Sequence, residues 1–128
     1  MAIRLQKMQK KNPQNQDMIK WYLTHEKVGT VGMKEISAAI GKRSSLSSGD
    51  VQSALRNLVE LMPTFLKIGH SINLEGFGIF RISVNSEGMD TAEELHTSHV
   101  KKVKILFLPS VELKRNLEDI SFEIIDTE

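Results

Sequence analysis

Glu75-Gly76-Phe77-Gly78-Ile79-Phe80-Arg81 is the stretch that decides the fold of this chain. Two glycines flank one phenylalanine inside a run of alternating apolar residues. Glycine has no Cβ, so it allows a bulge or a tight bend where one backbone passes close to another. The stretch therefore predicts β-structure over Ser71–Val84, as one long strand or as two strands with a bulge.

The residues before this stretch predict a helical hairpin. Apolar residues at helical spacing indicate a short helix over Thr30–Arg43 and a longer helix that begins at Ser47 or Ser48 and ends at Gly69. Pro63 lies inside the longer helix and is expected to bend it, because proline removes a backbone donor. The broad apolar stripe of this helix exceeds what one short neighbour can bury, so we expect part of it to lie between subunits.

The residues after the stretch predict a returning strand, a helix and a final edge strand. An arm-like connection over residues 85–99 leads to a strand over Val100–Leu108. A helix over Val111–Leu117 follows, and Ser121–Ile125 is the edge strand, which we expect to pair with the N-terminal residues. Alternation along the returning strand predicts one apolar face and one basic face, with Val103, Ile105 and Phe107 opposite to Lys102 and Lys104.

The first 30 residues predict a β-hairpin. Ile3–Lys11 mixes apolar and basic positions, residues 12–17 have the composition of a turn, and Ile19–Val28 is a second strand. Alternation places Trp21 and Leu23 on one face and Tyr22 on the other. We expect Trp21 to pack against the sheet, and the alternative is that exposed aromatic rings stack on unpaired bases beside a basic cluster. That cluster consists of Arg4, Lys7, Lys10, Lys11 and Lys20.

The composition restricts the class of protein. The 128 residues suffice for one domain, and contents of 40% hydrophobic and 5% aromatic residues favour a small core that dimerisation completes. The chain has no cysteine, which excludes disulfides, thiolate metal sites and cysteine nucleophiles and fits a reducing cytoplasm. No apolar run approaches the roughly 20 residues that cross a bilayer, and no signal peptide is expected.

The net charge of +1 is nearly uninformative, but the charges are unevenly distributed. Residues 1–43 hold nine Lys and Arg against three Asp and Glu, whereas residues 44–128 hold eight against thirteen. One interpretation is a solvated face. The other is a basic stripe that contacts phosphates or an acidic partner.

The order of these elements, together with the Gly76-Phe77-Gly78 motif, resembles the HU/integration-host-factor family of bacterial histone-like DNA-binding proteins. The resemblance covers about the last three quarters of the chain. It implies an α+β fold, an HU-like intertwined dimer with a helical hairpin and an antiparallel sheet that carries an arm. The predicted N-terminal β-hairpin is an addition to that pattern. Four short motifs together resemble a divergent, Bacteroidetes-type subgroup: Lys11-Asn12-Pro13, Leu46-Ser47-Ser48, Ser86-Glu87-Gly88 and Lys101-Lys102-Val103.

The arm departs from the family. In typical relatives a basic arm tip carries a proline that wedges between base steps of bent DNA. Here residues 85–99 contain no proline, no Lys and no Arg, and four acidic residues. Phosphates repel such a tip, so the wedge is not transferred to this chain. Met89 and Leu95 are candidate apolar wedges, and the alternative is that they tuck against the sheet or belong to a mobile loop.

The resemblance implies DNA contacts for cations near the arm. Lysines on an exposed strand also protect a sheet edge from aggregation, which is the alternative role. The basic and glycine positions that relatives carry around Pro109 are replaced by Leu108, Ser110 and Val111, so the resemblance does not carry over the usual phosphate contact at these positions. The following helix has two cations in its last turn, which alternatively stabilise the helix dipole. The predicted DNA-binding residues are Arg81, Lys101, Lys102, Lys104, Lys114 and Arg115, and the structural motif is Gly76, Phe77, Gly78 and Pro109.

Enzymatic chemistry has little support in this sequence. No GxSxG motif, phosphate-binding glycine loop or carboxylate pair with a partner base is present, so we expect no catalysis, no cofactor and no small-molecule substrate. His96 and His99 have metal-ligand spacing on a helix, but two histidines without a third ligand do not define a metal site. His25 and His70 are isolated.

These observations predict a cytoplasmic, nucleoid-associated HU-like homodimer. It would contact double-stranded DNA through phosphates and shape, with little sequence specificity and no membrane partner. Residues 1–30 would form an extension packed on an HU-like domain of residues 31–128. The alternative is a dimeric HU-fold structural or protein-interaction module whose DNA binding is weak or lost.

Overall fold

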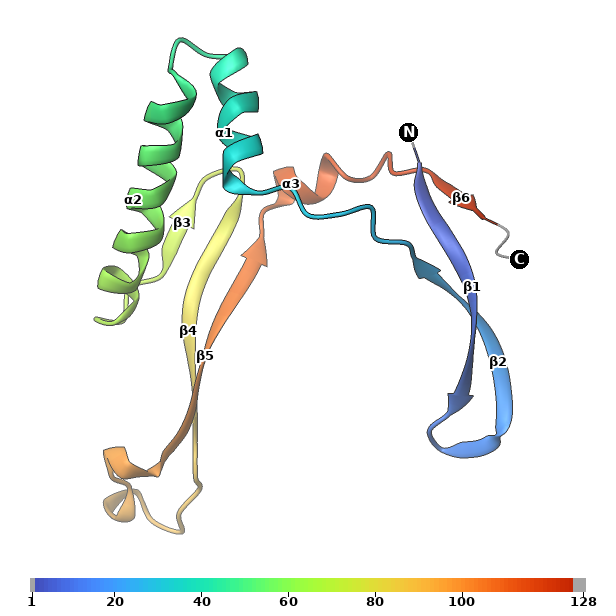
Figure 1. Ribbon diagram of the computed structural model, residues 1–128. Helices are drawn as coiled ribbons and strands as arrows, with labels where there is room; N and C mark the ends of the chain where they lie inside the picture. The colour runs from blue at the N-terminus through green and yellow to red at the C-terminus, as the bar shows by residue number, and fades with distance from the viewer. Residues whose placement is uncertain (1, 126–128) are drawn as a thin grey trace. The chain divides into compact units, whose positions relative to one another are not determined.

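A computed structural model describes residues 2–125, apart from the side chain of Gln16 (Figure 1). These residues form a mixed α+β fold with two compact units. One unit contains residues 31–116, and the other contains residues 2–30 together with residues 117–125. Each unit has its own three-stranded sheet.

The unit of residues 31–116 begins with a helical hairpin of α1 (Met33–Lys42) and α2 (Ser48–Leu66). The first helix starts three residues later than predicted, because Gly32 is its N-cap and donates its backbone N–H to the Glu35 carboxylate at 3.0 Å. Ser47 caps α2 as predicted, and its Oγ accepts the Asp50 N–H at 3.1 Å.

The C-terminal end of α2 differs from the prediction. The helix continues past Pro63 and ends at Leu66, three residues before Gly69. The residues between them form a turn in which the Gly69 N–H donates to the Leu66 carbonyl at 3.1 Å. Gly69 has a φ of +92°, a conformation that glycine adopts without strain.

The Gly-Phe-Gly stretch is a turn between two strands, β3 (Ile72–Leu74) and β4 (Gly78–Ser86). The Phe77 N–H donates to the Leu74 carbonyl at 2.8 Å, and Gly76 has a φ of +82°. The bend is therefore a tight turn and not a bulge within one strand.

The second glycine of the motif lies where two backbones meet. Gly78 is the first residue of β4 and is buried. A Cβ built on it would overlap the Leu108 carbonyl oxygen and the Phe107 ring. The close approach of backbone to backbone that the sequence predicts is present at this position.

The strand β5 (Val100–Pro109) pairs antiparallel with β4 and completes the sheet in the order β3-β4-β5. The paired strands extend away from the helices as a ribbon (Figure 1), which we call the arm. Residues 87–99 form its tip and contain two short 3-10 turns, η1 (Ala92–Glu94) and η2 (Thr97–His99).

The core of this unit is small. Among the described residues, the buried hydrophobic side chains are Val51 and Leu66. Three phenylalanine rings cluster at the base of the arm, with centroid separations of 4.8 to 6.0 Å between Phe77, Phe80 and Phe107. So little buried apolar surface is unusual for a domain that folds alone.

The helix α3 (Val111–Arg115) follows β5 and is shorter than predicted, since it ends before Leu117. Ser110 is its N-cap and accepts the Leu113 N–H at 3.0 Å. The same hydroxyl donates to the Gly76 carbonyl at 2.8 Å, so it ties α3 to the glycine turn. None of the helices in residues 2–125 is long and apolar enough to cross a membrane.

The other unit is a sheet in the order β2-β1-β6. The strands β1 (Ile3–Asn12) and β2 (Asn15–His25) pair antiparallel, and β6 (Phe122–Ile124) pairs with β1 in parallel. The register puts Trp21 and Leu23 on one face and Tyr22 on the other, as predicted. The prediction that Trp21 packs against the sheet is wrong, because its side chain is 66% exposed.

Candidate nucleic-acid interface

The arm has one apolar face and one basic face, as the alternation in the sequence predicts. On the apolar face, Phe80 lies opposite Phe107, Ile82 opposite Ile105, and Val84 opposite Val103. All six of these residues are apolar, whereas the three cations in the regular register of the two strands lie on the other face.

The basic face carries three of the predicted DNA-binding residues. Arg81 lies opposite Leu106, Lys104 opposite Ser83, and Lys102 opposite Asn85. The register of the two strands therefore brings cations from β4 and β5 onto one surface. We call this surface, formed by Arg81, Ser83, Asn85, Lys102 and Lys104, the basic arm face.

Lys101 lies at an irregularity next to this face. The register shifts between Asn85 and Ser86, and β4 supplies no residue opposite Lys101. A residue left over in this way is a β-bulge, and bulges change the direction of a side chain relative to the sheet. The structure therefore does not place Lys101 in the regular row of the basic arm face.

The six predicted cations are available for an anionic partner. All of them are exposed. Among residues 2–125, the two ion pairs are Arg4 with Glu26 and Arg56 with Glu60. None of the six predicted cations is therefore neutralised by a described carboxylate.

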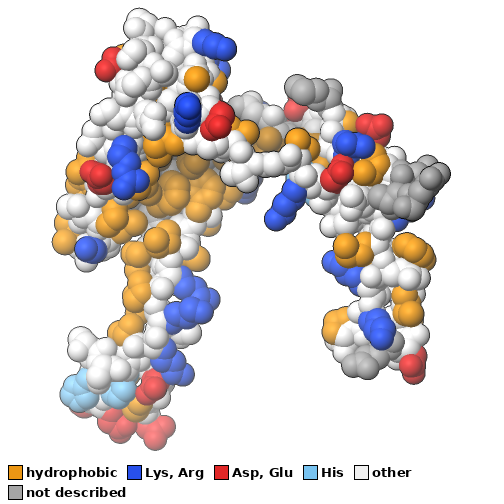
Figure 2. Space-filling model, in the orientation of Figure 1, with side chains coloured by type: hydrophobic (Ala, Val, Ile, Leu, Met, Phe, Trp, Pro, Cys, Tyr) orange, Lys and Arg blue, Asp and Glu red, His pale blue; other side chains and the backbone are white. Residues whose placement is uncertain are grey.

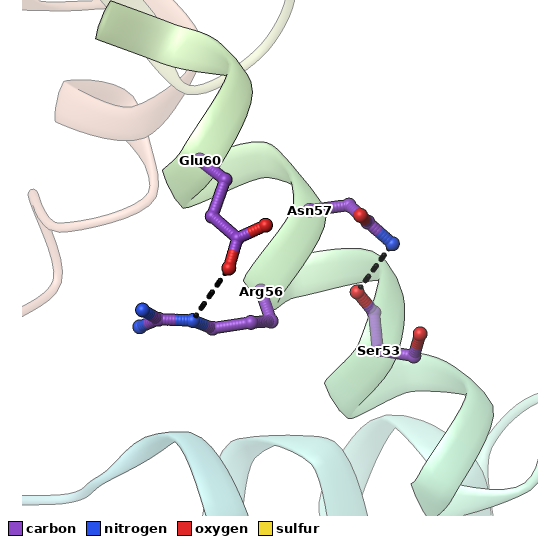
Figure 3. A network of polar contacts seen from close by, with 4 residues as sticks. All are labelled: Ser53, Arg56, Asn57 and Glu60. Atoms are coloured by element: carbon purple, nitrogen blue, oxygen red, sulfur yellow. Dashed lines mark hydrogen bonds and ion pairs between the residues drawn. The ribbon is translucent and has the colours of Figure 1, made fainter.

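Arg56 on α2 differs from the six predicted cations, because it is paired with an acidic residue of its own helix (Figure 3). Its Nε lies 3.3 Å from Glu60 Oε1, one helical turn further along α2. Beside this pair, the Asn57 side chain donates to the Ser53 carbonyl at 3.0 Å. The Glu60 carboxylate offsets the charge of Arg56, so this face of α2 has little net charge with which to attract DNA.

Lys114 and Arg115 lie at the other end of β5 from the arm tip. They occupy the last turn of α3, which begins after Pro109. The seven residue-to-residue steps from Lys102 to Pro109 span about 24 Å of strand. The structure therefore does not gather all six predicted cations into one patch, and these two are separate from the basic arm face.

The arm tip is acidic (Figure 2). Four carboxylates and no Lys or Arg occur in residues 87–99, and Figure 2 shows acidic and histidine side chains at the tip beyond the basic ones. All four acidic residues of the tip are exposed. The field along the arm therefore changes sign between Lys102 and the tip.

The histidine pair at the tip forms a local turn contact. The His96 N–H donates to His99 Nδ1 at 3.0 Å, and the ring centroids are 5.8 Å apart. Residues 2–125 contain no cluster of three or more His, Asp or Glu side chains that could hold a metal ion. The hydrogen bond uses one ring nitrogen of His99 to fix the turn.

The apolar arm face borders a groove beside the end of α2. Its volume is about 350 Å³, and Figure 2 shows an extended apolar surface where the helical hairpin meets the arm. Three of its four strand residues remain exposed, with 65% of Ile105 and 58% of both Val84 and Val103 accessible. The groove is lined by Pro63, Leu66, Lys67, Ile82, Val84, Val103 and Ile105.

Known proteins share both the sequence pattern and the fold of this chain. The model of the HU-HIG family, an HU domain fused to wHTH, Ig or a glycine-rich motif, matches residues 1–124. The chain belongs to the HU-HIG family. A search of curated proteins finds no match.

Two solved structures resemble the HU-HIG chain in fold. One is from Bacteroides vulgatus and is provisionally assigned as a bacterial DNA-binding protein, with a TM-score of 0.68 and 9% identity. The match covers 97% of this chain, which spans about half (48%) of the length of that protein. The other is Anabaena HU in a cocrystal with DNA, with a TM-score of 0.54 and 14% identity over 70% of this chain and 99% of that one.

Sequence reasoning missed two polar residues of the HU-HIG arm. Ser83 and Asn85 lie on the basic arm face, at the second and fourth positions after Arg81. Hydroxyl and amide groups are common donors to phosphate oxygens. The signal that could have found them is the alternation from Arg81 onward, because every second residue of a strand lies on the same face.

Proposed function

We propose that this HU-HIG chain is a nucleoid-associated protein of the bacterial cytoplasm that binds duplex DNA through phosphates and shape, with little sequence specificity. The observation that carries the proposal is the basic arm face, on which Arg81, Lys102 and Lys104 lie together without acidic partners. The HU-HIG assignment and the fold shared with a DNA-bound HU support it.

The basic arm face is suited to the DNA backbone. Lysine ammonium groups displace condensed counterions from phosphates, and this release supplies most of the sequence-independent affinity. Ser83 and Asn85 add neutral donors that fix the arm along the strand. Specific readout of a base edge needs side chains that enter a groove. In this proposal the cations of the basic arm face contact phosphates instead, so they add little sequence specificity.

A second copy of the chain would cover the apolar face of the arm. This face and the adjacent groove leave large side chains such as Ile105 and Val103 exposed, whereas the single chain buries only two hydrophobic residues among those described. Covering such a face stabilises by about 25 cal/mol for each Å² removed from water. In the resulting homodimer, two basic arm faces would line one concave surface for the duplex, with Lys101 at its edge.

The arms would bend DNA less than proline-tipped relatives do. The carboxylates of the tip repel the phosphates that flank either groove. Met89 and Leu95 therefore stay outside the minor groove, and no base step is unstacked. Lys114 and Arg115 lie in α3, beyond the end of β5 at the base of the arm. In this proposal they contact only DNA that continues past the base of the arm.

Fluorescence anisotropy of a labelled 30-base-pair duplex across a salt series tests the proposal. We expect the affinity to fall steeply with salt, with a slope of about 0.9 for each phosphate contact. The double variant Lys102→Gln/Lys104→Gln is expected to reduce the slope by about 1.8 for each chain. Lys34→Gln is the control, because it removes one exposed charge from α1, away from the basic arm face. Duplex affinity that Lys102→Gln/Lys104→Gln leaves unchanged would contradict the role of the basic arm face.

The acidic tip favours a second candidate function, a dimeric HU-fold module for protein interaction with weak or lost DNA binding. Its four carboxylates suit a basic protein partner better than DNA. The same salt series separates the two candidates. Absence of duplex binding at low salt by a folded dimer would favour the interaction module. Neither candidate involves catalysis, in line with the HU type of fold.

A further inference from the structure

One face of the β1–β2 hairpin arranges its side chains in two rows. Lys7 lies opposite Leu23, Gln9 opposite Trp21, and Lys11 opposite Ile19. Along β1 the row is Lys7, Gln9 and Lys11, and along β2 it is Ile19, Trp21 and Leu23. We call these six residues the Trp21 face. Trp21 is diagonal to both lysines, at the roughly 7–8 Å spacing over which long side chains act together.

The apolar row of the Trp21 face is exposed. The exposed fractions are 53% for Ile19, 66% for Trp21 and 52% for Leu23. A sheet face that belongs to a core would bury such a row. Here an exposed aromatic ring with an aliphatic side chain on each side lies beside two cations.

The cations of the hairpin have few acidic neighbours. Residues 3–25 contain five Lys and Arg and one acidic residue, Asp17. Arg4 is paired with Glu26 at 3.4 Å, whereas Lys7 and Lys11 have no ion-pair partner among residues 2–125. The hairpin therefore has an unbalanced positive charge that attracts a polyanion.

The opposite face of the hairpin is basic too but is arranged differently. Lys10 lies directly opposite Lys20, an arrangement that is unfavourable for like charges. The Lys10 ammonium also lies 5.9 Å from the centre of the Tyr22 ring. The Tyr22 ring therefore already has a cation of the same hairpin beside it, whereas the exposed indole of Trp21 can stack on another ring.

We propose that the Trp21 face binds single-stranded nucleic acid. The β1 row would contact the phosphates, and the β2 row would stack on the unpaired bases that project from the same strand. Proteins that bind single strands combine a cationic track with aromatic side chains in this way. The proposal goes beyond the duplex function, because it needs neither the arm nor a second copy of the chain.

A single strand fits the Trp21 face better than a duplex does. In a duplex both faces of every internal base are covered by neighbouring bases, so an indole reaches one only after unstacking, which costs a few kcal/mol. In a single strand the base faces are free. The duplex would leave the apolar row without a partner.

Intrinsic fluorescence gives a direct test, because Trp21 is the single tryptophan of the chain. The full chain would be titrated with a thymidine 12-mer, with a duplex of equal charge, and with heparin as a polyanion without bases. Stacking on the indole quenches its emission, so we expect strong quenching by the single strand and little by the duplex or heparin. Equal quenching by all three ligands would overturn the proposal.

Two matched double variants test which face of the hairpin contacts the phosphates. Their binding is measured by the anisotropy of a labelled thymidine 12-mer. Lys7→Gln/Lys11→Gln is expected to lower the salt slope by about 1.4, because each single-strand phosphate contact contributes about 0.7. Lys10→Gln/Lys20→Gln removes the same charge from the opposite face and should lower it less. If the two double variants behave alike, the Trp21 face is not the binding face.

A substitution of the indole tests the stacking step. Trp21→Ala is expected to weaken single-strand binding about 5- to 100-fold, whereas Trp21→Phe keeps a ring and should lose much less. Circular dichroism of both variants checks that the hairpin still forms. An affinity that Trp21→Ala leaves unchanged would overturn the proposal even if duplex binding is intact. Lys102→Gln/Lys104→Gln should leave the quenching unaltered, so failure of the duplex function would be seen separately.

Discussion

The arm and the N-terminal hairpin are both two-stranded antiparallel ribbons, but they distribute the same kinds of side chain in opposite ways. The arm separates them, with Ile82 and Ile105 on one face and Arg81 and Lys104 on the other. The hairpin mixes them, so that each of its faces carries both lysines and large apolar residues (Figure 2). Segregation is typical of a sheet with one face in a core. Mixing is typical of a ribbon whose two faces both meet water or a charged ligand.

The largest expected effect is a charge placed on the apolar face of the arm. Ile105→Glu puts a carboxylate into the surface that the second copy is expected to cover. The unpaired charge should cost about 3 kcal/mol or more, which is over 100-fold in the dimer Kd. Sedimentation velocity across a concentration series measures this change.

Leu23→Glu is the matched substitution in the hairpin, where it should leave the dimer intact because neither face of that ribbon is a core face. Lys104→Glu, on the basic arm face, is the second control. A dimer that Ile105→Glu leaves unchanged, or that Leu23→Glu disrupts, would break the comparison between the two ribbons.

The next effect concerns the close backbone approach at the base of the arm. Gly78→Ala would force its methyl group against Leu108 and Phe107. We expect a loss of about 1–3 kcal/mol in the free energy of unfolding, measured by urea denaturation. Gly88→Ala at the arm tip has no atom within 4 Å of the added Cβ and should change stability by less than about 0.5 kcal/mol. Equal stability of the two variants would contradict the packing described for Gly78.

A smaller effect is expected at Ser110, which links α3 to the glycine turn. Ser110→Ala removes the N-cap of α3 and the hydrogen bond to the Gly76 carbonyl. The loss should be about 1 kcal/mol, the usual value for an N-cap. Thermal melting monitored by circular dichroism measures it, and Ser110→Thr, which keeps a hydroxyl, should recover most of the loss. An unchanged melting temperature of Ser110→Ala would show that the glycine turn is stable without the hydrogen bonds of this hydroxyl.

The smallest effect is expected at the arm tip. Met89→Ala and Leu95→Ala should leave the bend of a bound duplex unchanged, because we expect the acidic tip to stay outside the groove. Energy transfer between fluorophores on the two ends of a 30-base-pair duplex measures the bend. A large change in either variant would show that an apolar side chain does insert between base steps.

Local patterns predicted much of the fold. The two faces of β5 follow from alternation, and the Ser47 cap follows from a serine before an apolar periodic run. The choice between a turn and a bulge at Gly76 did not follow, because glycine allows both. Contacts with Ser110, far along the chain, favour the turn, since its N–H donates to the Phe77 carbonyl at 3.0 Å and its hydroxyl to Gly76.

The candidate site was predictable only in part. That Lys102 and Lys104 share a face is a property of one strand. That Arg81 joins them depends on the register of two strands across the 13-residue tip, and the sequence alone does not fix that register. Trp21 was predicted to pack because tryptophan usually does, and no local pattern reveals that it is exposed in the described part of the chain.

The parallel pairing of β6 with β1 has a consequence for the order in which the chain is made. The partner of Ile3–Leu5 is Phe122–Ile124, so the edge of β1 stays open while most of the chain is still being synthesised. At about 5–20 residues per second, this interval lasts roughly 6–24 s on a bacterial ribosome. An open strand edge is a site for wrong pairing, and charged side chains along it oppose such pairing. Arg4 lies in the segment of β1 that waits for β6, and it supplies such a charge.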